Sequence, residues 1–118
     1  MRAFSFPKRE RVLNRSDFVN ANREGKRYHT ANFAIALRKN RPGVSRLGIT
    51  ASKKTGNAVT RNRIKRLIRE FYRLHKPYLP QGCDIVIAAK KGAGDLDFWK
   101  VREELLDFFT HKRFGALR

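Results

Sequence analysis

Two segments in the first half of the chain alternate between large apolar residues and other residues. Large apolar side chains occupy every second position between residues 32 and 39, and a similar alternation returns between residues 46 and 52. A period of two predicts two half-buried β-strands. Because the turn-forming sequence Arg41-Pro42-Gly43 lies between them, we expect these two strands to form a hairpin. The apolar run CDIVIAA at residues 83–89 predicts a third strand, buried in the sheet.

Three other segments have the signals of helices. The first is predicted over residues 17–24, with Ser16 as its N-cap and Gly25 after its last residue. The second runs over residues 61–76 and stops before Pro77, and both Asn57 and Thr60 are possible N-caps. The last follows the N-cap Asp97 and has an apolar stripe made of Phe98, Val101, Leu105 and Phe108.

The order helix, strands, helix, strand, helix predicts a small α/β sandwich, with helices packed against one mainly antiparallel sheet. At 118 residues the chain fits a single domain, and residues 1–15 read as a basic, irregular N-terminal arm.

The charge suggests a polyanionic partner. The chain has 28 Lys and Arg against 10 Asp and Glu, a formal net charge of +18. Of this excess, +17 belongs to residues 1–80 and only +1 to residues 81–118. Nucleic acid is therefore the first candidate partner and an anionic membrane surface the second. One cysteine excludes an internal disulfide, and no apolar run is long enough to span a bilayer, so we expect a cytoplasmic protein without a membrane partner.

The central predicted helix has an apolar face and an opposite cationic face. The apolar residues share one side at about 100° per residue: Ile64, Leu67, Ile68 and Phe71. The residues predicted to bind RNA occupy the other side and its borders: Arg61, Asn62, Arg63, Lys65, Arg66, Arg69 and Arg73. Glu70 is the single acid in this run, so like charges repel one another unless phosphates relieve the repulsion. The alternative is an ordinary solvated basic face.

Two neighbouring features fit RNA binding. Lys53, Lys54 and the Gly56-Asn57 turn place cations and backbone N–H groups near the start of the central helix, a favourable position for an anion. Phe18 is a candidate for stacking on a base, although core packing explains it equally well, and Asn22 shares its helix face. Ala34 and Ala36 form the floor of a shallow groove or permit close helix packing.

The sequence lacks the residues of a protein nuclease. His29, His75 and His111 are far apart and have no metal-ligand spacing. The acids cluster between residues 95 and 107, away from the basic region, and Cys83 begins an apolar strand. We therefore expect no catalytic residue and no protein metal site.

The segment KKTGNAVTRNRIKRLIRE at residues 53–70 resembles the signature of the bacterial ribonuclease P protein subunit. The match extends to the Phe18 helix, to Leu47-Gly48-Ile49, and to the strand 84–89 with Lys90-Lys91 after it. The resemblance implies an α+β fold, a two-layer α/β sandwich of order αβββαβα with a left-handed βαβ crossover, similar to a ribosomal-protein domain. It implies a 1:1 complex with the catalytic ribonuclease P RNA, without an obligate protein partner. The resemblance also implies that the substrate is precursor tRNA, whose 5′ leader the RNA removes with Mg²⁺ held mainly by RNA.

By position, the resemblance assigns residues to two RNA contacts. Lys53, Lys54, Asn57 and the cationic face of the central helix match the segment that faces the RNA subunit and the leader. Phe18, Asn22, Ala34 and Ala36 match a cleft for the leader. Asn22 stands where a second Phe often occurs, and Ala36 stands where a larger side chain can occur. The alternative function is a basic ribosomal-type RNA-binding protein, which the run Arg-Asn-Arg-Ile-Lys-Arg disfavours.

Overall fold

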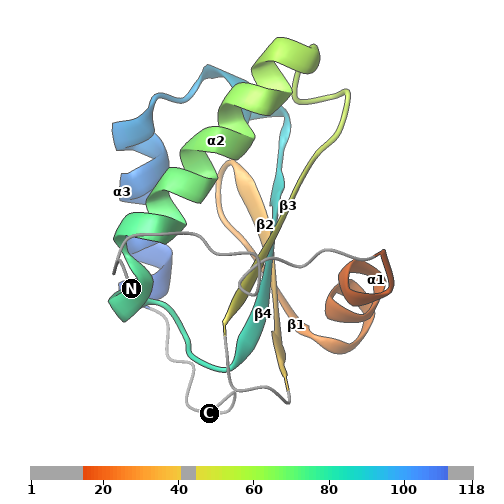
Figure 1. Cartoon of the computed structure of the whole chain (residues 1–118). Coiled ribbons are helices and arrows are strands. Elements are labelled where there is room, and N and C mark those ends of the chain that lie inside the picture. The colour runs from red at the N-terminus through yellow and green to blue at the C-terminus, as the bar shows by residue number, and fades with distance from the viewer. Residues whose placement is uncertain (1–14, 41–44, 112–118) are drawn as a thin grey trace.

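The computed structural model describes residues 15–40 and 45–111. Their main elements follow the chain in the order shown in Figure 1. These are α1 (Arg15–Glu24), β1 (Lys26–His29), β2 (Phe33–Lys39), β3 (Arg46–Ala51), α2 (Ala58–Leu74), η2 (Lys76–Tyr78), β4 (Cys83–Ala89), η3 (Lys91–Asp95) and α3 (Phe98–His111). The predicted N-terminal arm, apart from Arg15, and the predicted turn at residues 41–43 lie outside the described residues.

The four strands form one sheet in the order β1-β2-β4-β3. β2 is antiparallel to β1 and to β4, whereas β3 and β4 are parallel neighbours joined through α2. The predicted hairpin between residues 32–39 and 46–52 is therefore wrong, because β4 lies between these two strands. Six of the seven β4 residues are buried. A strand with so many buried residues is stabilised most in the middle of the sheet. There, neighbouring strands pair with both of its edges, and helices cover both of its faces.

Helices lie on both faces of this sheet. Figure 1 shows α2 and α3 together on one side and α1 alone on the other. The main core lies between the sheet and the α2–α3 pair. The strands contribute Phe33, Ile35, Leu37, Leu47, Ile85 and Ile87, and the helices contribute Ile64, Ile68, Phe71, Val101, Leu105, Phe108 and Phe109. The apolar stripes predicted for the second and third helices are thus confirmed as core-facing, with Leu67 and Phe98 half-buried at the edge.

The α1 helix docks on the other face through a much smaller apolar contact. Ala21 packs against Ala36 of β2 and Val86 of β4, with Phe18 at the side. Ion pairs lie on either side of this contact, because Asp17 and Glu24, near the two ends of the helix, bind arginines of the sheet. Close approach is possible after the helix because residue 25 is glycine: a Cβ there would lie 2.6 Å from the carbonyl oxygen of Leu37.

The helix boundaries differ from the predictions by a few residues. α1 begins at Arg15, so Ser16 lies inside its first turn rather than at the N-cap. α2 begins earlier and ends earlier than predicted, and of its two possible caps Asn57 is the one used, since its side chain accepts from the Thr60 N–H at 2.9 Å. Asp97 caps α3 as predicted, by accepting from the Lys100 N–H at 2.9 Å. No helix within the described residues is both long and apolar enough to cross a membrane.

Candidate nucleic-acid interface

The turn before α2 holds Lys53 and Lys54 at the surface. Both lysines are exposed, and the turn that carries them is fixed by Thr55, whose buried hydroxyl donates to the Ala89 carbonyl at 3.2 Å. Gly56 follows with a φ of 152°, a backbone conformation that favours glycine. The turn therefore places two cations beside the N-terminal end of α2, where backbone N–H groups favour anions.

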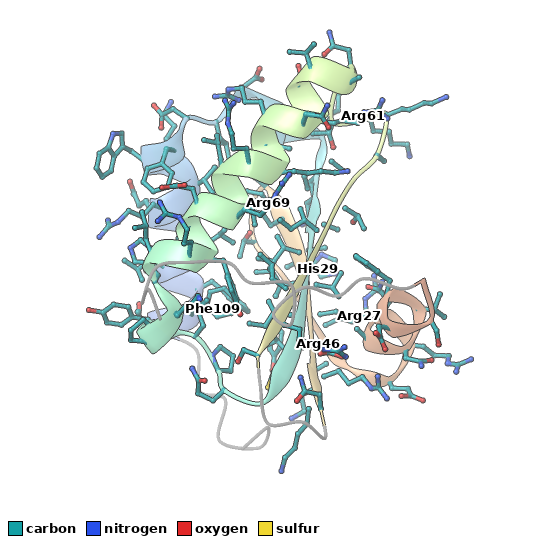
Figure 2. All side chains as sticks on the ribbon, viewed as in Figure 1. Arg27, His29, Arg46, Arg61, Arg69 and Phe109 are labelled. Atoms are coloured by element: carbon teal, nitrogen blue, oxygen red, sulfur yellow. The ribbon has the colours of Figure 1, made fainter. Side chains whose placement is uncertain are left out.

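The solvent-facing side of α2 carries the cations that the sequence predicts there. Asn62, Arg66 and Arg69 are exposed, whereas Arg61 and Lys65 are half-buried. We call these five residues together with Lys53 and Lys54 the α2 basic surface; Figure 2 labels Arg61 and Arg69 on it. The first turn of α2 contains no acidic residue. Among the described residues, no carboxylate forms an ion pair with any member of the α2 basic surface. These cations are therefore available to phosphates.

Two further arginines of α2 have partners inside the fold. Arg63 turns toward the segment before α3, where it donates to the carbonyl oxygen of Gly94 at 3.3 Å and to that of Leu96. Arg73 forms an ion pair with Glu70 on the same helix. Sequence spacing placed both arginines with the RNA-binding residues, and the geometry shows that each also has a structural contact.

The predicted leader-cleft residues lie on α1 and on the neighbouring strand β2, with different exposures. Ala36 is only 3% exposed because it lies under Ala21 of α1, whereas Ala34, two residues earlier on the same face, is half-exposed. Phe18 packs beside this contact but stays partly exposed, so packing does not cover the whole ring. The side chain of Asn22 donates back to the Phe18 carbonyl at 3.0 Å.

An ionic network joins α1 to the sheet, and sequence reasoning missed it. Arg46 of β3 donates two hydrogen bonds of 2.8 Å to Asp84 of β4, which is fully buried, and a third of 3.3 Å to Asp17 of α1. Asn40 donates to the same Asp84 carboxylate at 2.9 Å. The hydrogen bonds from Arg46 to Asp84 raise the pKa of the guanidinium, so it stays charged. The available signal was a single acid within the apolar run CDIVIAA, because a buried carboxylate requires a partner.

A surface hollow beside α3 is lined by three acidic residues and by one lysine, Lys100. The hollow has a volume of about 500 Å³, and its acidic residues are Glu103, Glu104 and Asp107 of α3. Glu104 is already used, since it accepts hydrogen bonds from the Thr30 hydroxyl and from the backbone and side-chain amides of Asn32. It therefore orders the β1–β2 turn.

The histidines and the cysteine of the described residues lie apart from one another. No group of three or more His, Cys, Asp or Glu within residues 15–40 and 45–111 could hold a metal ion. His29 is exposed on β1, while His75 is buried and accepts a hydrogen bond from Arg102 at 3.2 Å. Burial raises the pKa of the Cys83 thiol, which disfavours the nucleophilic thiolate.

The fold and this surface define a basic α+β protein with an exposed cationic helix on one face of its sheet and a small-residue contact with α1 on the other. A family model described as Ribonuclease P matches residues 6–113. The chain is 45% identical over 121 residues to the ribonuclease P protein component of Dictyoglomus thermophilum, covering 100% of this chain and 98% of that protein. It is 47% identical over 105 residues to the one from Geotalea uraniireducens, covering 89% and 92%.

Solved structures agree with these relatives. The ribonuclease P protein from Thermotoga maritima matches with a TM-score of 0.79 and 39% identity, over 88% of this chain and 98% of that chain. The protein from Staphylococcus aureus matches with a TM-score of 0.75 and 34% identity, over 81% and 88%. The chain therefore belongs to the ribonuclease P protein family.

Proposed function

We propose that this chain is the protein subunit of ribonuclease P, which binds the catalytic RNA and the 5′ leader of precursor tRNA and so assists removal of the leader. Family membership supports this function. The observation that carries it is the α2 basic surface, which has no carboxylate partner among the described residues. The two RNAs repel one another, and a protein that contacts phosphates of both reduces that repulsion.

The two surfaces divide this work. The α2 basic surface supplies Arg and Lys to phosphates, while the amide of Asn62 can donate to and accept from a base edge or a ribose hydroxyl. The cleft beside α1 offers the edge of Phe18 and the small side chain of Ala34 to an unpaired strand. In this division the protein positions the leader and takes no chemical step itself.

Mg²⁺ belongs to the RNA part of this proposal. When bound, the metal supplies charge stabilisation and activates water for phosphodiester cleavage. The described residues offer no group of carboxylates, histidines or cysteine that fits it. We assign the metal to phosphates of the RNA subunit and substrate, and the protein acts in a 1:1 cytoplasmic complex without another protein.

One assay tests the function against its rivals. The protein is mixed with bacterial ribonuclease P RNA and precursor tRNA at low Mg²⁺, where phosphate repulsion is poorly screened. We expect the protein to accelerate leader cleavage and to cleave nothing without the RNA. A reaction without protein and one with an unrelated basic protein are the controls. Absence of stimulation would favour a ribosomal-type RNA-binding protein, and cleavage without RNA would favour a protein nuclease.

A further inference from the structure

The single tryptophan of the chain stands at the surface of α3. Trp99 is 69% exposed, although tryptophan is a highly buried residue on average. Its ring makes an edge-on contact with that of Phe98, with 5.4 Å between the ring centroids, and Phe98 is itself only half-buried. The fold therefore gains little from this large apolar ring. Because a lone exposed apolar residue is ordinary, its neighbours decide whether it marks a binding surface.

The surface hollow described above lies beside Trp99. The helix residues that line it recur every three or four positions, so they share one side of α3, and Trp99 borders that side one turn before Glu103. The rest of the lining is apolar, with Leu96 before the helix and Ala31 in the β1–β2 turn. The hollow thus combines apolar side chains with carboxylates next to an exposed aromatic ring.

The carboxylates of the hollow differ in what they already bind. Glu104 accepts its hydrogen bonds from the β1–β2 turn. Glu103 is exposed and forms neither an ion pair nor a side-chain hydrogen bond with any residue that the structure describes. Three carboxylates against Lys100 give the lining a net charge of −2, in a chain whose net charge is +18. The hollow is therefore a negative patch on a basic protein.

The chemistry of this patch disfavours two ligand classes. A metal ion is disfavoured because no group of three or more His, Cys, Asp or Glu in residues 15–40 and 45–111 could hold one. RNA is disfavoured because its phosphates would meet carboxylates. Charge interactions between exposed groups are largely screened beyond about 8 Å at physiological ionic strength, so the carboxylates of the hollow outweigh cations farther away on the molecule.

An arginine side chain fits the same patch. Its guanidinium can donate two parallel hydrogen bonds to one carboxylate and can also stack on the face of an indole ring. Its methylene groups can lie against apolar side chains such as that of Leu96. Tryptophan is also among the residues that contribute most to protein–protein binding. Charge and ring together therefore favour a protein partner.

We propose that Trp99 and the hollow beside it dock an arginine-bearing segment of another protein. In this contact an arginine of the partner lies between the carboxylate of Glu103 and the ring of Trp99. Figure 1 shows α3 and α1 on opposite sides of the sheet, and no residue of the α2 basic surface lines the hollow. The docked segment therefore leaves the proposed RNA contacts free. The inference goes beyond the proposed function, because leader removal by the 1:1 complex does not require this partner.

The tryptophan itself supplies the measurement. Because Trp99 is the single tryptophan of the chain, its fluorescence reports on this surface alone. The full-length protein is titrated with an eight-residue peptide that contains two arginines and two leucines. A peptide with citrulline in place of both arginines is the control, since citrulline keeps the shape and lacks the charge. A single-stranded oligoribonucleotide is titrated in parallel.

We expect the arginine peptide to change the emission of Trp99 in a saturable way and to bind about tenfold more tightly than the citrulline peptide. Glu103→Gln should weaken binding of the arginine peptide about fivefold, the upper end for an exposed ion pair. Asp95→Asn is the matched control, since it removes an exposed carboxylate that does not line the hollow, and should stay within about twofold. Calorimetry should show about two- to fivefold weaker binding for Trp99→Ala and partial recovery for Trp99→Phe.

Four results would overturn the inference. Equal affinities for the two peptides would show that the hollow does not select a guanidinium, and equal losses for Glu103→Gln and Asp95→Asn would indicate only a general attraction to acids. A change in Trp99 emission with the oligoribonucleotide and not with the peptide would make RNA the occupant. Dimers that Trp99→Ala dissociates, detected by sedimentation, would make the occupant a second copy of the chain.

The proposed function is tested separately from this surface. Trp99→Ala and Glu103→Gln should stimulate leader cleavage by ribonuclease P RNA as the unmodified protein does. A failure of the unmodified protein to stimulate cleavage would refute the proposed function and leave the peptide measurements intact. Loss of stimulation in these two variants alone would assign the surface to the RNA complex and overturn the protein partner. Unfolding curves of both variants exclude loss of the folded protein as the cause.

Discussion

Arg46 and Arg66 are the same side chain in opposite environments. Arg46 binds the buried carboxylate of Asp84 and reaches Asp17 of α1, whereas Arg66 is exposed and has no ion-pair partner among the described residues. All three acids between residues 15 and 80, namely Asp17, Glu24 and Glu70, pair with arginines within the fold. These acids therefore separate Arg46, which is held within the fold, from Arg66, which faces solvent.

Of the changes considered, removing the charge of the buried acid Asp84 should have the largest effect on stability. Asp84→Asn takes the charge from the carboxylate that Arg46 contacts twice, and it leaves the guanidinium without its main partner. Breaking a buried pair on one side costs about 3–5 kcal/mol, so we expect a loss of that order in the free energy of unfolding. Urea denaturation followed by circular dichroism measures it.

The control for that experiment is a substitution of the exposed arginine, Arg66. Arg66→Ala should change the free energy of unfolding by less than about 0.5 kcal/mol, as surface substitutions usually do. A loss below about 1 kcal/mol for Asp84→Asn would show that the Arg46–Asp84 contact contributes little to the fold, and the division between the two kinds of arginine would lose its basis.

The positions of most strands and of the helices were predictable from the sequence, but the pairing of the strands was not. Alternation depends only on a strand having one buried face, so residues 33–39 and 46–51 were found correctly. The insertion of β4 between these strands depends on contacts that join residues 38 to 56 positions apart in the chain. The pattern of apolar positions did not reveal strand β1, because this strand has only four residues, KRYH, and one half-buried side chain, Tyr28.

The same division applies to the candidate site. The cationic face of α2 follows from helical periodicity alone, which is why Asn62, Arg66 and Arg69 were placed correctly at the surface. Arg63 could not be separated from them, because its partners are carbonyl groups of a segment 31 or more residues away. Which side chains of β1 face the same way as the α1-contacting residues of β2 depends on strand register, which no local pattern in the sequence fixes.

The second prediction concerns the α2 basic surface. Replacing Arg66 and Arg69 together by alanine should weaken binding to ribonuclease P RNA by about ten- to a hundredfold, on the order of 1.4 kcal/mol for each tenfold change. Each lost phosphate contact should lower the slope of log affinity against log salt by about 0.7–0.9. Filter binding over a salt series measures both quantities.

The fold should survive this double substitution, because the buried face of α2 is untouched. Lys26→Ala is a matched control, since it removes an exposed cation that lies on β1 and not on α2. An unchanged salt slope for the double variant would indicate that the α2 basic surface is an ordinary solvated face, the alternative that the sequence left open.

The smallest effect on RNA binding should come from replacing Arg63, which lies on α2 but donates to the carbonyls of Gly94 and Leu96. Because these bonds fix the segment before α3, Arg63→Ala should cost about 1.5–3 kcal/mol in the free energy of unfolding, the range for hydrogen bonds from a charged group. For RNA binding, Arg63→Ala should change the slope of log affinity against log salt less than Arg66→Ala does. The opposite result, full stability with a slope lowered by about 0.7, would move Arg63 into the RNA-binding group. Position on the helix would then decide the role of these arginines, rather than the partner that each one finds in the fold.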